Sequence, residues 1–149
     1  PNTPTLAITK IAGNPVPASA VGSYSTPDIT LPSTTTNPIS IEISGANIPV
    51  GTSVKITSVP QSGSSTSANA TLTGDEASST ATASLSISGS SPSVLTAEAT
   101  FTVQVAMFYE GEKIEKVTVA STPGKGSEVT YITETGKKIP AAMLMASIK

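Results

Sequence analysis

The sequence predicts an all-β protein folded as an antiparallel sandwich, and three observations support this fold class. Nearly every apolar stretch alternates apolar with polar residues, which is the period of strands that bury one face. Clusters rich in Gly, Pro, Asn and Ser interrupt these stretches at short intervals. β-branched residues are frequent, and no amphipathic helical pattern separates the stretches. We therefore expect short antiparallel strands joined by turns.

The expected strands of the first two thirds follow from this alternation. The clearest covers residues 38–44, where three isoleucines face one way and Ser, Glu and Ser face the other. The longest covers residues 95–109, and its length indicates either a bend or a strand that serves two sheets in turn. The remaining strands are expected at residues 5–11, 28–31, 52–60, 68–73 and 80–88.

The composition changes near residue 110, because seven charged residues lie in residues 1–109 and eleven in residues 110–149. We assign residues 1–109 to the sandwich and residues 110–149 to a β-meander extension, which can belong to the same domain. The meander strands are expected at residues 112–121, 128–133 and 139–148.

Residues 140–147 fit two structures. Pro140 suits the first turn of a helix, and the Ala- and Met-rich residues after it have high helix propensity. The alternation of Leu144, Ala146 and Ile148 favours a strand instead. We adopt the strand and keep the helix as the alternative.

Several residue types that carry chemistry are missing from the chain. It has no His, Cys, Trp or Arg, and instead contains 23 Ser and 23 Thr. The missing residue types most often supply proton transfer at neutral pH, metal or thiol chemistry, phosphate binding and the energetic hot spots of interfaces. We therefore expect no enzymatic activity and no cofactor.

Charge and hydropathy restrict the partners and the location. A net charge of −2 argues against nucleic acid or an anionic membrane surface. No apolar run approaches the ~20 residues of a transmembrane helix, so no transmembrane segment is expected. The low charge content and hydroxyl-rich composition favour an extracellular or cell-surface protein after removal of a signal peptide.

The acidic groups offer weak candidate sites. The Asp75-Glu76 pair could bind calcium, but no Asp-x-Asp spacing accompanies it, so a polar turn is the simpler interpretation. Glu110, Glu112 and Glu115 are interleaved with lysines, which is typical of a solvated turn. Paired carboxylates could also serve a glycosidase, but the aromatic platforms that hold sugars are lacking.

Two further positions could carry covalent modifications. Lys10, within an apolar strand, could form an isopeptide bond with an Asn if it were buried, or could protect an edge strand. Asn69-Ala70-Thr71 matches the N-glycosylation sequon, so Asn69 is a candidate glycan site, and O-glycosylation of the many hydroxyls is equally plausible.

The terminal strands are candidates for contacts between subunits. Residues 1–12 contain an alternating strand, and the Gly- and Pro-rich residues 13–17 could act as an extended hinge. This strand is either an ordinary first strand or one donated to a neighbouring chain by strand addition. The C-terminal strand is a second candidate donor. The expected interface residues are Leu6, Ile8, Ile11, Leu144 and Ile148.

Residues 39–44 and the following stretch Asn47-Ile48-Pro49-Val50-Gly51-Thr52-Ser53-Val54-Lys55-Ile56-Thr57 resemble bacterial extracellular Ig-like sandwich domains. In those domains a Pro-x-Gly-Thr turn leads into a Val-x-Ile/Val-Thr strand, and the likeness covers about residues 35–105. The resemblance implies an Ig-like sandwich that acts as a spacer, adhesin or filament subunit, with no catalytic residues.

We therefore expect a structural subunit of a pilus-like filament. It would form a homo-oligomer or homopolymer by strand addition and packing of apolar strand faces. The alternative is a cell-surface adhesin, or an Ig-like module that binds glycan or protein.

Overall fold

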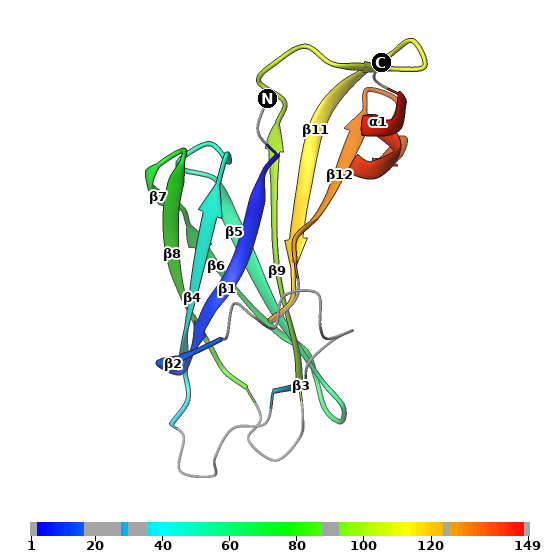
Figure 1. Ribbon diagram of the computed structural model, residues 1–149. Coiled ribbons are helices and arrows are strands. Elements are labelled where there is room, and N and C mark those ends of the chain that lie inside the picture. Colours follow the sequence, from blue (N-terminus) through cyan, green and yellow to red (C-terminus); the bar gives the residue numbers. More distant parts are fainter. Residues whose placement is uncertain (1–2, 17–27, 30–35, 88–92, 124–125, 148–149) are drawn as a thin grey trace.

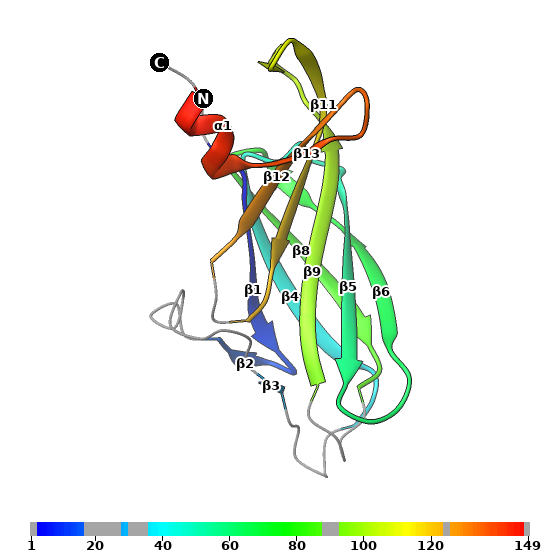
Figure 2. The same cartoon turned by 90° about the vertical axis from the view of Figure 1, so that its right-hand side faces the viewer.

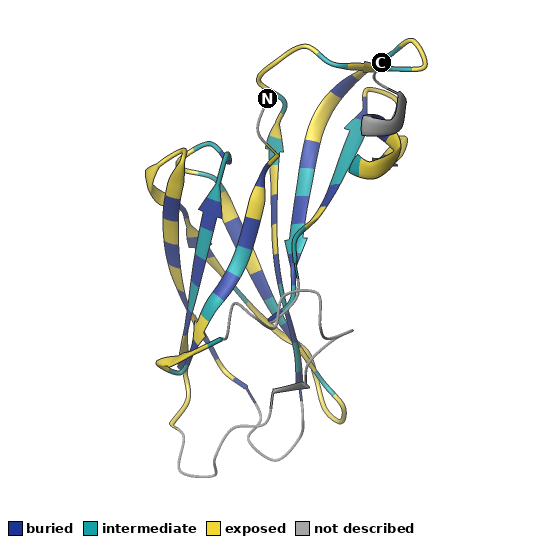
Figure 3. Cartoon of the chain, viewed as in Figure 1, coloured by how far each residue is buried: buried dark blue, intermediate teal, exposed yellow. Residues whose placement is uncertain are grey.

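The computed structural model describes residues 3–16, 28–29, 36–87, 93–123 and 126–147. It consists of two antiparallel sheets packed face to face (Figure 1), so the predicted all-β sandwich is confirmed. Buried and exposed residues alternate along the strands (Figure 3), as the sequence pattern predicts.

The first sheet has five strands. Every neighbouring pair in it is antiparallel. Its order is β2 (Asn14–Pro15), β1 (Thr5–Ile11), β4 (Ile39–Ala46), β8 (Ser78–Leu85) and β7 (Thr73–Asp75).

The second sheet has eight strands, and Figure 2 shows it from its outer side. Its main order is β13 (Lys138–Pro140), β12 (Glu128–Thr133), β11 (Glu112–Ser121), β9 (Ser93–Thr102), β5 (Ser53–Pro60) and β6 (Thr66–Thr71). Two short strands lie off this path, because β10 (Phe108–Tyr109) pairs with β11 and β3 (Asp28–Ile29) pairs with β9.

The core between the sheets is aliphatic. Ile39, Ile41 and Ile43 of β4 are all buried, as their alternation predicts. Val54 and Ile56 of β5 face them from the second sheet and are fully buried. The described aromatic side chains contribute no fully buried residue, so aliphatic burial supplies the core of the sandwich.

Two expected strands are divided in the structure. The strand predicted at 68–73 belongs to both sheets, because β6 pairs with β5 whereas β7 pairs with β8, and buried Leu72 lies between them. The strand predicted at 95–109 ends at Thr102 and resumes only at β10. At the break, Val103 N–H donates to Glu115 O (2.8 Å), so the chain still follows β11.

The predicted meander is present and continues the second sheet, since β11 pairs with both β9 and β12, and β12 pairs with β13. The prediction of a strand over residues 139–148 is wrong, because β13 ends at Pro140 and helix α1 (Ala141–Ser147) follows. Pro140 cannot donate to a sheet ladder, and the residues after it favour a helix. Of the two expected contact residues here, Leu144 lies in α1 and Ile148 lies outside the described residues.

The segment 13–17 differs from the extended hinge that its composition suggests. Ala12 and Gly13 have φ values of 51° and 82°, which are typical of the two-residue turn of a hairpin. β2 therefore pairs back on β1, and Val16 N–H donates to Thr9 O (2.8 Å). Pro17 lies outside the described residues.

Candidate functional site

The first strand, β1, lies near the margin of its sheet and completes the core. It pairs with β4 from Thr5↔Ala46 to Ile11↔Ile41, with one irregularity between Ile8 and Lys10. Leu6, Ile8 and Ile11, the residues expected to contact a neighbour, are 1%, 4% and 6% exposed in the chain's own core. These three side chains therefore fill a site in the hydrophobic core between the two sheets, which is called the β1 site below.

The edge of β1 that faces away from β4 has far fewer backbone hydrogen-bond partners. β2 pairs only with Lys10 and Ile11. Near the start of β1, Leu6 N–H donates to Ser127 Oγ (2.8 Å), and the Ser127 hydroxyl donates to Leu6 O (2.6 Å). Ser127 precedes β12, so a single hydroxyl from the C-terminal third takes the place of a ladder partner. On one side the ladder with β4 holds β1 along its length, and on the other side the short hairpin, the Val16–Thr9 bond and this hydroxyl hold it.

Lys10 is exposed at the surface. Its Nζ lies 4.0 Å from Glu42 Oε2, and about half of each side chain is exposed. Exposure removes the premise of a buried lysine that an isopeptide bond requires. The pair lies on the solvent face of the first sheet and contributes little to stability.

Glu112, within the acidic group Glu110, Glu112 and Glu115, forms a clasp. Its carboxylate accepts hydrogen bonds from Thr135 Oγ1 and from Thr133 Oγ1 (3.0 Å), and it pairs with Lys137 Nζ (3.1 Å). The Thr135 bond, followed by those from Lys137 and Thr133, lowers the pKa of Glu112. The same partnership raises the pKa of Lys137. The carboxylate is thus engaged in joining the start of β11 to the turn between β12 and β13.

The Asp75-Glu76 pair forms a turn at the end of β7. Both residues are exposed, and Glu76 O accepts a hydrogen bond from Asn47 N–H (2.7 Å). Across the described ranges, no group of three or more His, Cys, Asp or Glu side chains could hold a metal ion.

An apolar cleft of about 290 Å³ lies where the sandwich meets the C-terminal third. Pro4 and Pro49 line it from the sandwich, while Val103, Met107 and Leu144 line it from the other side. Leu144 is 2% exposed and packs with Ile114 and Ile139 in a second, smaller core. The expected contact residue Leu144 is therefore an internal packing residue that also forms part of the cleft wall.

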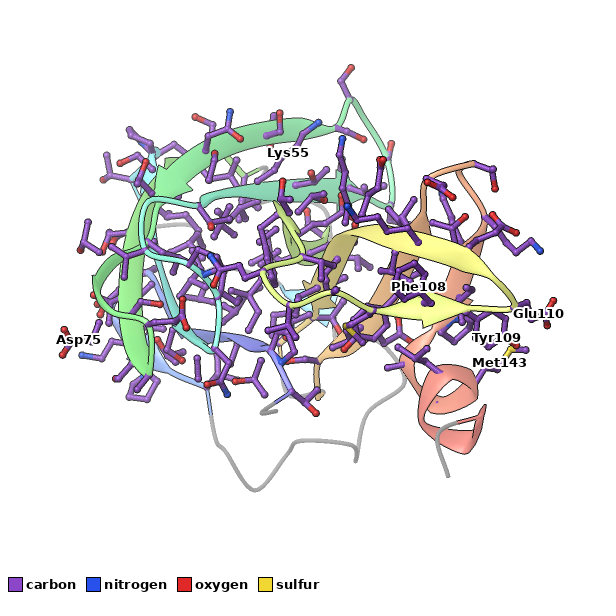
Figure 4. The ribbon with its side chains drawn as sticks, turned by 90° about the horizontal axis from the view of Figure 1, so that it is seen from above. Lys55, Asp75, Phe108, Tyr109, Glu110 and Met143 are labelled. Carbon is purple, nitrogen blue, oxygen red and sulfur yellow. The ribbon has the colours of Figure 1, made fainter. Side chains whose placement is uncertain are left out.

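Aromatic residues gather around this cleft, which sequence reasoning missed. Phe101 and Tyr131 line the cleft and are half-buried, and burial raises the pKa of Tyr131. Phe108 is 63% exposed, and Figure 4 shows it on the β10–β11 hairpin, whose tip carries Tyr109 and Glu110. A signal was present in the sequence, because Phe108 is out of phase with the alternation of residues 95–109.

The candidate glycan site, Asn69, is exposed in the middle of β6, opposite Lys55 of β5. Its modification stays a prediction. Among the helices that the structure describes, none is long and apolar enough to cross a membrane. Comparison with protein-family models, curated proteins and solved structures gave no match to this chain.

Proposed function

We propose that this protein is a structural subunit of an extracellular or cell-surface assembly, such as a pilus-like filament, whose chains join by exchanging β1. The observation that carries the proposal is the way in which β1 packs and pairs in the sandwich. Its apolar side chains complete the core, yet a full ladder holds it on only one side. The β1 strand of a neighbouring chain can make the same contacts in the same β1 site, which is the basis of strand addition and domain swapping.

The loss of stability expected when no β1 strand fills the β1 site supports strand exchange. Burying a Leu or Ile side chain contributes about 1.5–3 kcal/mol. Leu6, Ile8 and Ile11 together contribute about 5–9 kcal/mol on this scale, which is comparable to the whole stability of a small domain. A chain with this aliphatic core therefore needs a β1 strand in the β1 site, and that strand can come from the same chain or from another.

The connection between β1 and the rest of the chain is long enough for exchange. Residues 16–27 separate the β1–β2 hairpin from β3, and a chain of this length reaches up to ~40 Å when extended. This distance exceeds the length of β1 itself, which is on the order of 23 Å.

The outer face of the first sheet is compatible with close packing of subunits. Ser40, Thr80, Thr82 and Ser84 are exposed there, and Lys10 and Glu42 pair with each other. Hydroxyl-rich faces lose less on desolvation than charged ones, because isolated charges are costly to remove from water.

An engineered disulfide tests the proposal. Ala7 of β1 and Ser44 of β4 are cross-strand partners on the outer face, and the chain contains no Cys. In an Ala7→Cys/Ser44→Cys variant that is oxidised after assembly, we expect disulfides between chains, seen as covalently linked dimers or larger species on a non-reducing gel. Disulfides only within chains, in material that has assembled, would contradict exchange.

The matched control is Ser44→Cys/Thr80→Cys, which joins β4 to β8. Neither of these strands exchanges in the proposal, so this variant should form disulfides only within chains. Cross-strand partners lie at Cα separations that a disulfide can bridge.

The binding module is a second candidate function, and the cleft lined by Phe101 and Tyr131 together with the exposed Phe108 of β10 favours it. Aromatic side chains are the usual anchors of contact sites. This function predicts a lasting monomer that binds a defined glycan or protein in a direct titration, with binding lost in Phe108→Ser. Equal binding by Phe108→Ser would contradict it.

A further inference from the structure

Strand β6 differs from the other three sheet margins. β2 and β7 have two and three residues, and β13 has three residues that include Lys138 and Pro140. Short strands, charges and prolines are common means of preventing a sheet edge from pairing with another chain. β6 has six residues with no charge and no proline, and its register with β5 is regular. Among the four terminal strands of the described sheets, β6 is therefore the one that lacks these protections, and the adjacent part of β8 beyond Thr80 is likewise unpaired on its outer side.

The main chain of β6 presents hydrogen-bonding groups at this edge. Leu72 N–H donates to Thr52 O (3.0 Å), and backbone groups alternate in direction along a strand. Ala68 and Ala70 therefore bond toward β5, whereas Ser67, Asn69 and Thr71 direct their N–H and C=O groups away from it. No described strand pairs with that edge, and β6 is the outermost ribbon of its sheet in Figure 2.

We propose that this edge pairs with β6 of a second copy of the chain, antiparallel and about a two-fold axis. The two eight-stranded sheets would then form one continuous sheet. In the pairing centred on Asn69, the two Asn69 residues face each other, and Ser67 of each chain faces Thr71 of the partner subunit. All the side chains that meet are small and uncharged.

The charges near the edge permit a second copy. The nearest registered charge is Lys55, which lies beside Asn69 on β5. Across the proposed joint the two Lys55 residues are three strand spacings apart, about 14 Å. This separation exceeds the screening length of about 8 Å at physiological salt, so their repulsion is weak. A symmetric joint also removes two open edges in one contact.

This contact lies at the opposite margin of the sandwich from β1 and does not require strand exchange. Combined with reciprocal exchange of β1, it would give an open chain of subunits with two kinds of two-fold joint. The sequon at Asn69 lies in the centre of the edge, and a glycan there would occupy the joint. A glycan on Asn69, detected in the intact mass of the native protein, would overturn the proposal.

Amide hydrogen exchange as a function of protein concentration tests the pairing. The amides of Ser67, Asn69 and Thr71 should gain protection as the dimer forms in sedimentation measurements. The amides of Ala68 and Ala70 should not change, because they already bond to β5. A dimer without this alternating protection, or a monomer up to millimolar concentration, would overturn the proposal.

A charge variant provides a second test. Asn69→Glu places two carboxylates face to face across the joint, while Lys55 supports the new side chain within each chain. We expect the dimer dissociation constant to rise at least tenfold, with thermal stability retained. The control Ser40→Glu adds the same charge to the exposed face of β4 and should leave the constant unchanged. Equal effects of the two variants would overturn the proposal.

The Ala7→Cys/Ser44→Cys variant separates this joint from strand exchange. When oxidised as a dilute monomer, its β1 is locked in its own chain and cannot exchange. The locked protein should still dimerise through β6. If locking abolishes association, the dimer came from exchange and the β6 joint is wrong.

Discussion

The body of the sandwich and its C-terminal end are stabilised in different ways. In the body, 21 buried aliphatic residues form a single core between the sheets, and hydroxyl groups cover the outside. At the end, the buried cluster of the described residues consists of Ile114, Ile139 and Leu144, and the Glu112 clasp adds polar bonds. The aromatic side chains that the structure describes lie toward this end, where they are half-buried or exposed. Stability therefore depends on the body, whereas the exposed apolar side chains Phe108 and Met143 lie at the end.

The largest effect is expected in the body. Ile41 is fully buried and lies between Ile11 of β1 and Ala83 of β8. Ile41→Ala should lower the free energy of unfolding by about 3–4 kcal/mol, measured by urea denaturation. The neighbouring exposed Ser40→Ala should change it by less than about 0.5 kcal/mol. Similar values for the two variants would show that the body lacks the tight core described above.

A smaller and more local effect is expected at the end. Leu144→Ala removes one of the three side chains in the described buried hydrophobic cluster there and should cost about 2 kcal/mol. Faster amide exchange should be confined to α1, β13 and the adjacent part of β12. Met143→Ala, on the exposed side of the same helix, is the control. Uniformly faster exchange throughout the body would mean that the two cores unfold as one.

Ser127 connects the two regions, and its loss should have a moderate effect. Ser127→Ala removes both hydrogen bonds to Leu6, and we expect a loss of about 1 kcal/mol. The amide of Leu6 should exchange faster, while that of Ala7, which is paired with Ser44, should change less. An unchanged Leu6 amide would show that the hydroxyl does not hold the first strand.

The smallest effect is a pH dependence at the clasp. The pKa of Glu112 is lowered in the folded protein, so its contribution is complete above the ordinary glutamate pKa of about 4.3. It is lost as the pH falls below that value through the lowered pKa. The stability difference between the wild type and Glu112→Gln should therefore shrink on acidification through this range in paired denaturation curves. A constant difference would contradict the clasp.

Local pattern explains why the fold was predictable. The alternation of Ile39, Ile41 and Ile43 identified β4 and its buried face, because the strand period is a local property. The end of the chain was harder, since helix propensity and alternation disagree after Pro140. The strand ends after Thr102 although Val103 still bonds to Glu115 of the neighbouring strand, and alternation alone gives no sign of this end.

The candidate site was less accessible from sequence. Leu6 and Ser127 are separated by 121 residues, and no spacing rule connects them. The cleft likewise combines residues from both ends of the chain, such as Pro4 and Leu144. Alternation marked Leu6 and Ile8 as one apolar face, and the irregularity between Ile8 and Lys10 brings Ile11 into the same core. Alternation does not show which chain's core that face fills.

The most direct test removes residues 1–12 and supplies them as a separate peptide. We predict that the truncated chain reaches the native fold only when the peptide is added. A peptide with Leu6→Ser and Ile8→Ser should fail to restore folding. A truncated chain that folds alone and ignores the peptide, or one that the peptide cannot restore at millimolar concentration, would contradict a first strand that can be supplied by another chain.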